Sequence, residues 1–359
     1  MRFELDDDQA LLRSSTRELL ENEAALADTR AIMEEVAEGF DKNMYAQLGE
    51  LGYLGVLLSE EDGGLGAIAF AIIMAEMGRV AFPGPFLEWT VAVRALADCG
   101  HAEATQWQAK ASGGDALVVL ALDEDIRSAD PRDAQAVYEN GRVRGTKVFV
   151  PFGEHADALL VSTAQGLALV PRPGTGWNAS PLETFDHAQR FALVELDNEA
   201  SLVAEGEAAR AVLDRAQRLG ALGASAEMFG LMERSVESAV QYTSEREAFG
   251  VPIGSFQALQ HRAADMLLKA ESTRSAAFRA AWAEENGEPN ADYLVSVAKA
   301  WAGPAGRFVA GQNIQLHGGV GFTWEYDPHI YLKRIKTREQ FHGSNAWHTE
   351  NALRQSPVI

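Results

Sequence analysis

The sequence predicts an α+β protein with an N-terminal helical domain, a middle domain built as a small β-barrel or sandwich, and a C-terminal four-helix bundle. Three observations predict this order: apolar residues at helical spacing in the first part, short apolar runs between turn residues in the middle, and long helical segments afterwards. The predicted domains span residues 1–115, 116–204 and 205–359.

The first domain is predicted to be helical because apolar residues recur at steps of three and four, as in ALLRSSTRELL (10–20) and MYAQLGELGYLGVLL (44–58). A glycine-rich turn and a segment with two prolines interrupt the pattern. The apolar stretch 67–82 between them is too short to span a membrane and carries Glu76 and Arg79. We expect it to form a buried core helix.

The middle domain is predicted to be a β domain because short β-branched or apolar runs, such as ALVVLAL and GRVRGTKVFV, alternate with Gly, Pro, Asn and Asp. Helices of about ten residues do not alternate with these runs, which disfavours a parallel doubly wound sheet. The expected arrangement is therefore a small antiparallel barrel or sandwich.

The last domain is predicted to be a helical bundle because helical spacing returns over long stretches rich in small residues. The predicted helices cover residues 208–247, 255–286, 291–319 and 327–341. Glycine and alanine gather between Gly220 and Ala226, where a glycine costs about 1 kcal/mol of helix propensity. Something must therefore approach this face closely, either another helix backbone or a bound ligand.

The composition restricts the partners and the compartment. The chain has 359 residues and a net charge of -21, which argues against nucleic acid and anionic membranes as partners. A single cysteine, Cys99, excludes an internal disulfide, and no His or Cys cluster has metal-ligand spacing. The acidic start lacks the features of a secretory signal. We expect a cytoplasmic protein without a membrane span or a metal.

Two segments have residues that suit a ligand, and each has an ordinary structural explanation. Arg246 lies in the last turn of a predicted helix, where a cation interacts favourably with the helix dipole, and its guanidinium could equally bind a phosphate. Gly318, Gly319 and Gly321 follow another helix, where glycines end the helix or allow a ligand to approach the backbone. The residues alone leave both choices open.

Taken together, these segments resemble the acyl-CoA dehydrogenase family over nearly the whole chain. The strongest matches are REAFGVPIGSFQALQHRAADM and QLHGGVGF, which are similar to the family patterns R-x-x-FG-x-x-I-x-x-FQ and Q-x-x-GG-x-G-F. SEEDGGLG and GTKVFVPFGEHADALLV match more weakly. The resemblance implies a tetrameric flavoprotein oxidoreductase of lipid metabolism that binds FAD between subunits, oxidises an acyl-CoA thioester and passes electrons to electron-transfer flavoprotein or an equivalent acceptor.

The resemblance also implies which residues contact FAD. The positions matched to its pyrophosphate and adenine portion are Arg246, Phe249, Gln257, Gln315, Gly318 and Gly319. On the flavin side, Phe149, Val150 and Pro151 replace the family's W-I-T or W-I-S segment, and Asp123 lies near the family's usual threonine. Phe149, Val150 and Ser344 complete the expected FAD contacts, although proline supplies neither a hydroxyl nor an N–H.

The catalytic base does not stand at either position that the family uses. His342 occupies the place of the family's C-terminal glutamate, directly before Gly343, and Gly220 falls on the alternative position in the first long helix. The nearest acid on that helix is Glu227, whose apolar neighbours Ala226 and Met228 would favour proton uptake by its carboxylate. Glu227 and His342 are therefore the two candidate catalytic residues, and His342 also suits a helix-ending role.

Four functions fit these observations. The first is an FAD-dependent acyl-CoA dehydrogenase that forms its own tetramer and uses a base at a position other than the usual glutamate. The second is a subunit of a heteromeric dehydrogenase whose partner supplies the base. Such heteromers are known in the family for bulky substrates such as steroid side-chain CoA esters. The third hypothesis is a flavin-binding subunit without turnover, and the fourth is a family relative that activates oxygen. An intact adenine side beside an altered flavin side favours the heteromer.

Overall fold

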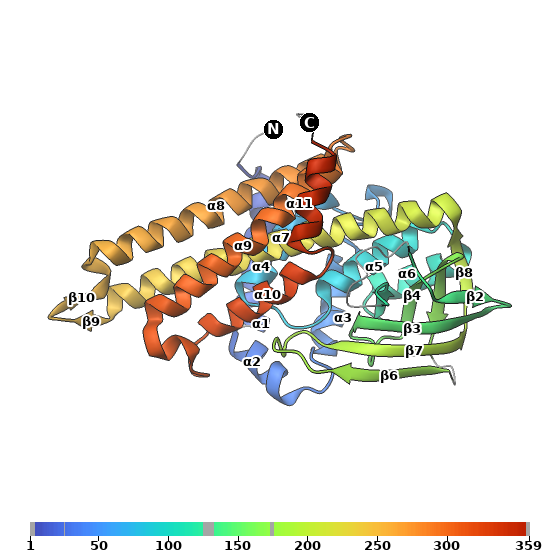
Figure 1. Ribbon diagram of the computed structural model, residues 1–359, viewed down its shortest axis with the longest axis horizontal. Coiled ribbons are helices and arrows are strands. Elements are labelled where there is room, and N and C mark those ends of the chain that lie inside the picture. Colours follow the sequence, from blue (N-terminus) through green and yellow to red (C-terminus); the bar gives the residue numbers. More distant parts are fainter. Residues whose placement is uncertain (1–3, 25, 125–132, 173–175, 357–359) are drawn as a thin grey trace. The chain divides into compact units, whose positions relative to one another are not determined.

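The computed structural model describes residues 4–24, 26–124, 133–172 and 176–356. The chain folds into two compact units. One comprises Met1–Thr29, Ala67–Phe82 and Ala221–Ile359, and the other comprises Arg30–Gly66 and Pro83–Gly220. The predicted α+β class is confirmed, because helices come first, two sheets follow and long helices complete the chain (Figure 1). The boundaries of the three predicted domains stay a prediction.

The N-terminal part consists of six α-helices in the described residues. They are α1 (Asp7–Glu23), α2 (Leu26–Glu35), α3 (Lys42–Glu50), α4 (Gly66–Arg79), α5 (Phe86–Asp98) and α6 (Ala102–Ser112). Asp6 begins α1 with a capping box, in which its side chain accepts from the Gln9 backbone and the Gln9 side chain accepts from the Asp6 backbone. Helix α4 is buried along nearly its whole length, as its apolar sequence predicts.

Two four-stranded sheets form the middle part, and their strands have the orders β1-β4-β5-β8 and β2-β3-β7-β6. The strands are β1 (Val118–Ala121), β2 (Val137–Glu139), β3 (Arg142–Pro151), β4 (Ala158–Thr163), β5 (Gly166–Pro171), β6 (Trp177–Leu182), β7 (Phe191–Glu199) and β8 (Ser201–Glu205). The described strands of this middle part form two open sheets and no closed barrel.

One strand pair departs from the predicted antiparallel arrangement. Strands β1 and β4 run parallel, with Val118 opposite Ala158, whereas the neighbouring pairs β4–β5 and β5–β8 are antiparallel. The link from β1 to β4 contains the β2–β3 hairpin, which belongs to the other sheet, so the chain returns to β1 in the same direction. A local sequence pattern does not reveal which sheet a strand joins.

The C-terminal part contains the long helices. They are α7 (Gly206–Glu245), α8 (Gln257–Glu285), α9 (Ala291–His317), α10 (Pro328–Gln340) and α11 (Asn345–Arg354), with the short strands β9 (Glu247–Ala248) and β10 (Val251–Pro252) between α7 and α8. The last predicted helix ends at residue 341, and the structure adds α11, which has ten residues. In the described residues, no helix is long and apolar enough to cross a membrane.

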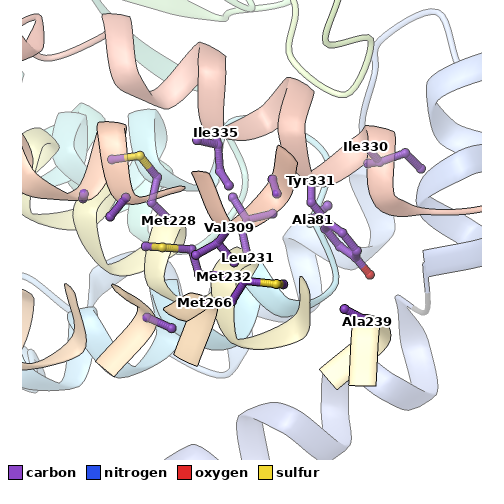
Figure 2. Packing of buried hydrophobic residues seen from close by; sticks show 14 of the residues in the cluster. Ala81, Met228, Leu231, Met232, Ala239, Met266, Val309, Ile330, Tyr331 and Ile335 are labelled. Atoms are coloured by element: carbon purple, nitrogen blue, oxygen red, sulfur yellow. The ribbon is translucent and has the colours of Figure 1, made fainter. Parts of the chain in front are cut away.

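The core of the first unit gathers side chains from several of these helices (Figure 2). Met228 and Met232 come from α7, Met266 from α8, and Tyr331 and Ile335 from α10, and all five are almost completely buried. Aliphatic, aromatic and thioether side chains of different shapes fill the space between the helices, and the hydroxyl of Tyr331 is the one polar side-chain group among these five. This packing fixes α10, whose C-terminal end leads into the candidate site.

Helix α4 approaches α7 closely at Glu227 and Gly230, directly after the run of small residues 220–226. The close approach predicted for that run itself stays a prediction. A Cβ atom added at Gly230 would collide with the carbonyl oxygen of Ala75, and one added at Gly78 would collide with the carbonyl oxygen of Glu227. Both glycines therefore allow two helix backbones to touch in the first unit. A neighbouring helix accounts for this part of α7.

Candidate functional site

The end of α7 presents Arg246 on a tight hairpin. The hairpin pairs Ala248 with Val251, and Phe249 and Gly250 at its tip both have positive φ, 55° and 81°. Two successive positive φ values suit the turn between short antiparallel strands. The Phe249 side chain is 96% exposed, and its ring lies 6.4 Å from that of Phe256. Gln257 begins α8 immediately afterwards, so the three predicted residues share one end of this helix pair (Figure 1).

The end of α9 presents Gln315, Gly318 and Gly319 on its surface. Gly318 ends the helix with φ 65° and ψ -142°, a conformation that side chains other than hydrogen rarely allow. A Cβ added at Gly318 or Gly319 would meet no atom within 4 Å, so their backbone faces open space. A ligand can reach this backbone without meeting a side chain.

Ring stacking brings the two segments together. The rings of Tyr242, near the end of α7, and His317, directly before Gly318, stack with centroids 4.3 Å apart. Tyr326 packs edge-on against both rings. The structure therefore places Arg246 and Gly318 on neighbouring helix ends although 72 residues separate them in the chain. The sequence offers no signal for this stack, since single aromatic residues at helix ends are common.

These exposed groups fit the FAD pyrophosphate and adenine portion that the family resemblance implies. The Arg246 guanidinium makes no ion pair with any residue that the structure describes, so all its N–H groups are available to a phosphate. The side chains of Gln257 and Gln315 are also exposed. An exposed arginine, an aromatic ring and bare glycine backbone form the kind of surface on which a dinucleotide can lie.

The other unit contains the residues predicted for the flavin side, and they offer fewer groups to a ligand. Phe149 has φ 52° at the bulge that interrupts the pairing of β3 with β7 between Lys147 and Val150. The Val150 side chain is buried, and Pro151 lacks an N–H. The FAD contacts predicted for Phe149 and Val150 thus stay predictions.

His342 lies in a left-handed turn after α10. Its φ is 57° and that of Gly343 is 91°, so two successive residues adopt positive φ. Gly343 is needed here on two counts, because an added Cβ would also lie 2.7 Å from His348 Nε2. Ser344 then caps α11, and its hydroxyl oxygen accepts from the Trp347 N–H at 3.3 Å. The FAD contact predicted for Ser344 stays a prediction.

The surroundings of His342 make its imidazole a weak base. Burial, with the positive charges of Arg338 and Lys299 nearby, lowers the pKa of His342 to about 3. Its side chain is neutral at pH 7, and a proton added to it would be held only weakly. The sequence alone made His342 a candidate base. It did not show that Arg338, four residues earlier, and Lys299, on α9, both place positive charge near the imidazole.

Glu227 does not have the apolar setting that its sequence neighbours predicted. Its carboxylate is buried, but Arg334 Nη1 lies 2.8 Å from one oxygen and Arg338 Nε lies 2.6 Å from the other. Adjacent helical residues point elsewhere, and the true surroundings come from α10, more than a hundred residues later. The expected apolar environment is wrong, while the assignment of Glu227 as a catalytic base stays a prediction.

Arg334 binds a backbone carbonyl group as well as Glu227. Arg334 also donates to the carbonyl oxygen of Phe82 at 2.9 Å. Arg334 and Arg338 are four residues apart in α10 and therefore share one face of this helix. That spacing was visible in LKRIKTREQ and would have indicated a basic helix face, but nothing in it indicates burial or a carboxylate partner.

Comparison with known proteins agrees with the family resemblance. Residues 201–356 match the model of the acyl-CoA dehydrogenase C-terminal domain, and residues 6–110 match that of the acyl-CoA dehydrogenase N-terminal domain. The acyl-CoA dehydrogenase IpdE2 of Mycobacterium tuberculosis is 30% identical over 331 residues, which cover 91% of each chain.

Two solved structures share the fold along nearly the whole chain. A steroid acyl-CoA dehydrogenase, the Tcur3481-Tcur3483 G363A variant, is 28% identical with a TM-score of 0.87 and covers 97% of both chains. The ChsE4-ChsE5 complex from Mycobacterium tuberculosis contains a chain that is 26% identical with a TM-score of 0.86, over 99% of this chain and 100% of that one.

Proposed function

Because this chain belongs to the acyl-CoA dehydrogenase family, we propose that it is one subunit of a heteromeric, FAD-dependent acyl-CoA dehydrogenase whose partner supplies the catalytic base. Membership supports the reaction, the removal of two hydrogens across the α and β carbons of an acyl-CoA thioester. The similarity to chains of the Tcur3481-Tcur3483 and ChsE4-ChsE5 proteins supports the heteromer.

The observation that carries this proposal is the state of the two candidate bases. Both carboxylate oxygens of Glu227 are bound to arginines, so the carboxylate is free to contact a substrate only if an ion pair breaks. At His342, the pKa of about 3 leaves a base too weak to compete for a proton on carbon at neutral pH. Neither group suits the abstraction of an α-proton, although each stays a candidate until it is replaced and assayed.

In this assignment, the chain binds the pyrophosphate and adenine portion of FAD. Arg246 would bind the pyrophosphate through charge-assisted hydrogen bonds, and Gln257 and Gln315 would contact the adenine side. Phe249 would pack beside this portion of FAD, and the backbone of Gly318 and Gly319 would contact it. When bound, FAD supplies the hydride acceptor for the reaction, and the protein holds and orients the reactants. Electron-transfer flavoprotein or an equivalent acceptor would then reoxidise the cofactor.

The test is to purify the full chain alone and together with an acyl-CoA dehydrogenase chain encoded nearby, both with added FAD. We expect flavin absorbance and anaerobic bleaching by an acyl-CoA only in the co-purified assembly. The panel contains butanoyl-CoA, dodecanoyl-CoA and a steroid side-chain CoA ester. Stoichiometric FAD and full bleaching in the chain alone would overturn the heteromer and leave a self-sufficient dehydrogenase.

A variant links the cofactor to the residues proposed here. Arg246→Ala should raise the FAD dissociation constant of the assembly at least about tenfold, because a hydrogen bond to a charged group contributes roughly 1.5–3 kcal/mol. Arg210→Ala removes another exposed arginine from the same helix α7 and serves as the control. Equal FAD affinity in the two variants would contradict the assignment of Arg246.

A further inference from the structure

Side chains from two helices bind three backbone carbonyl groups around the His342 turn. The carbonyls belong to Glu339, His342 and Gly343, at the end of α10 and just after it. Lys299 Nζ, on α9, donates to the carbonyl oxygens of Glu339 at 3.1 Å and Gly343 at 2.9 Å. His348 Nε2, on α11, donates to the carbonyl oxygen of His342 at 2.7 Å.

A chain of hydrogen bonds selects the His348 tautomer that can make this contact. Asn351 Nδ2 donates to Ser296 Oγ at 2.8 Å, which leaves the Ser296 hydroxyl proton free to point at His348 Nδ1, 3.2 Å away. His348 Nδ1 is then the acceptor, and Nε2 carries the proton that binds the His342 carbonyl, which can only accept. Both Ser296 and His348 are buried.

The second anchor is a lysine with no exposed surface. The Lys299 side chain is 0% exposed, and its ammonium nitrogen contacts two carbonyl groups of the turn rather than a carboxylate. Burying a lysine costs free energy unless its nitrogen is hydrogen bonded. A core position usually carries an apolar residue. We therefore attribute the lysine at this position to the two carbonyl groups, to which it donates hydrogen bonds.

The turn needs such support because a left-handed conformation is unfavourable for histidine. Positive φ at a residue other than glycine costs of order 1–3 kcal/mol, and it persists where the surroundings fix it. The side chain of Glu339 is fixed too, since Arg307 Nε lies 3.1 Å from one oxygen and Asn345 binds the other. Gly303 on α9 leaves the space in which Asn345 and Glu339 meet.

We propose that Lys299 and His348 are positioning residues that hold the His342 turn in its left-handed conformation and thereby fix the direction of the His342 imidazole. This inference rests on the proposed function in one respect, that it treats the His342 turn as part of the acyl-CoA site. The two anchors act through the backbone, so neither needs to touch a substrate. The two residues thereby fix the conformation of the turn before a ligand binds.

The effect of pH on the turn depends on the protonation states of the ionisable groups around it. Arg338 and Glu339 face it from α10, Lys299 and Arg307 from α9, and His348 from α11, with Asp292 acting on His348. Burial lowers the pKa of His348 to about 4 and that of Lys299 to about 7. Above pH 5, His342 and His348 are both neutral, and a neutral lysine amine still has two N–H groups for its two carbonyls.

The test follows the modification of His342 by diethyl pyrocarbonate, which reacts with neutral imidazole, in the purified full chain or its co-purified assembly. Peptide mass spectrometry reports the rate at His342, corrected for reagent hydrolysis. In the wild type we expect equal rates at pH 6 and pH 8. In Lys299→Met and His348→Leu, a released imidazole returns to a pKa near 6.5, so the rate at pH 6 should be about one quarter of that at pH 8.

Three further variants separate positioning from general stability. His348→Gln keeps a side-chain N–H and should retain the flat profile, and Lys336→Met removes an exposed lysine of α10 and should do the same. Ser296→Ala removes only the hydroxyl that selects the tautomer, so it carries the test if the Lys299 variant fails to fold. Flat profiles in His348→Leu and Ser296→Ala would overturn the proposal, even if both variants unfold at lower temperature.

The same preparations keep this inference separate from the proposed function. Flavin content and bleaching of the co-purified assembly test the heteromer, whereas the pH profile of His342 tests the positioning of the turn. In the wild-type assembly, butanoyl-CoA or a bulkier acyl-CoA should slow the modification of His342 at least threefold. Unchanged modification by every CoA ester that bleaches the flavin would remove the turn from the acyl-CoA site.

Discussion

Glu227, Arg334 and Arg338 form a buried charge cluster in which one carboxylate faces two guanidinium groups. All three side chains are at most 2% exposed, so water screens their interaction very little. The carbonyl oxygen of Phe82 takes up part of the donor capacity of Arg334. Because all three groups are buried, removal of the carboxylate charge takes away the negative charge that offsets the two guanidinium charges.

Replacement of Glu227 should therefore weaken the fold strongly. We expect Glu227→Gln to lower the free energy of unfolding by about 3–5 kcal/mol, the usual effect of breaking a buried ion pair from one side. Urea unfolding followed by circular dichroism measures it. The matched control is Glu350→Gln, which removes an exposed carboxylate paired with Arg354 and should cost less than about 1 kcal/mol. Equal losses in the two variants would contradict the structural role of Glu227.

Lys299 makes stability depend on pH in a defined direction. Burial lowers the pKa of Lys299 from 10.5 to about 7, and unfolding restores the ordinary value. Between pH 7 and pH 10.5 the unfolded chain therefore binds a proton that the folded chain does not. The free energy of unfolding rises with pH in that window, by up to about 1.4 kcal/mol per unit, and this contribution disappears in Lys299→Met.

The measurement compares urea unfolding of the wild type and Lys299→Met at pH 7.5 and pH 9.5. The wild type should gain about 2–3 kcal/mol relative to the variant over these two units. Other titrating groups are present in both proteins and cancel in the difference. Parallel stability curves would show that Lys299 is charged in the folded protein across this range.

At this scale, the sequence predicts which residues are unusual better than what surrounds them. The position of His342 before Gly343 was visible as a departure from the family pattern. The partners of Glu227 were not, because Arg334 and Arg338 lie 107 and 111 residues away in the chain. Only the tertiary packing of α7 against α10 decides whether a helix face is apolar or charged.

The turn between α10 and α11 depends on a glycine with two separate requirements. Gly343 has φ 91°, and an added Cβ would lie 2.7 Å from His348 Nε2 and 2.9 Å from Trp347 Cε3. Both limits come from neighbouring parts of the same turn. An alanine there must distort the backbone, displace the His348 ring that binds the His342 carbonyl, or do both.

Gly343→Ala should therefore destabilise the protein by about 2–4 kcal/mol, since a left-handed alanine costs about 1–2 kcal/mol before the steric contact is added. Gly319→Ala is the control, because a Cβ at Gly319 meets no atom within 4 Å and should change the stability by less than about 0.5 kcal/mol. Thermal or urea unfolding compares the two. A Gly343 variant as stable as the Gly319 variant would contradict the geometry of the turn.

Helices were predicted well from their periodicity, and the connections between elements less well. The apolar stretch 67–82 predicted a buried helix, and α4 covers Gly66–Arg79. The parallel pairing of β1 with β4 was not predicted, since it depends on the β2–β3 hairpin joining the other sheet. Helix α11 was not among the predicted helices, because its polar sequence lacks a strong apolar stripe.

For the molecule as a whole, the residues proposed to bind the pyrophosphate and adenine portion of FAD lie at or just beyond the ends of the long helices. Phe249 is 96% exposed, Phe322 is 73% exposed and Trp324 is 42% exposed, beside the unpaired guanidinium of Arg246 within the described residues. Large apolar side chains this exposed indicate a surface that is covered in the functional assembly. The family motifs located this region from the sequence, whereas the exposure of each ring required the structure.

The FAD content and the subunit affinity of the assembly should therefore depend on Phe249 more than on an exposed apolar residue elsewhere on the chain. In the co-purified assembly, Phe249→Ser should lower the FAD content several-fold and raise the subunit dissociation constant about tenfold, which corresponds to the loss of about 1.4 kcal/mol of contact. Flavin absorbance relative to protein absorbance and sedimentation velocity measure the two effects. Leu11→Ser removes a side chain that is 67% exposed on α1 and should change neither. If both variants retain FAD and assemble equally, Phe249 contacts neither the cofactor nor a partner, and the adenine side of the proposed site must lie elsewhere on the chain.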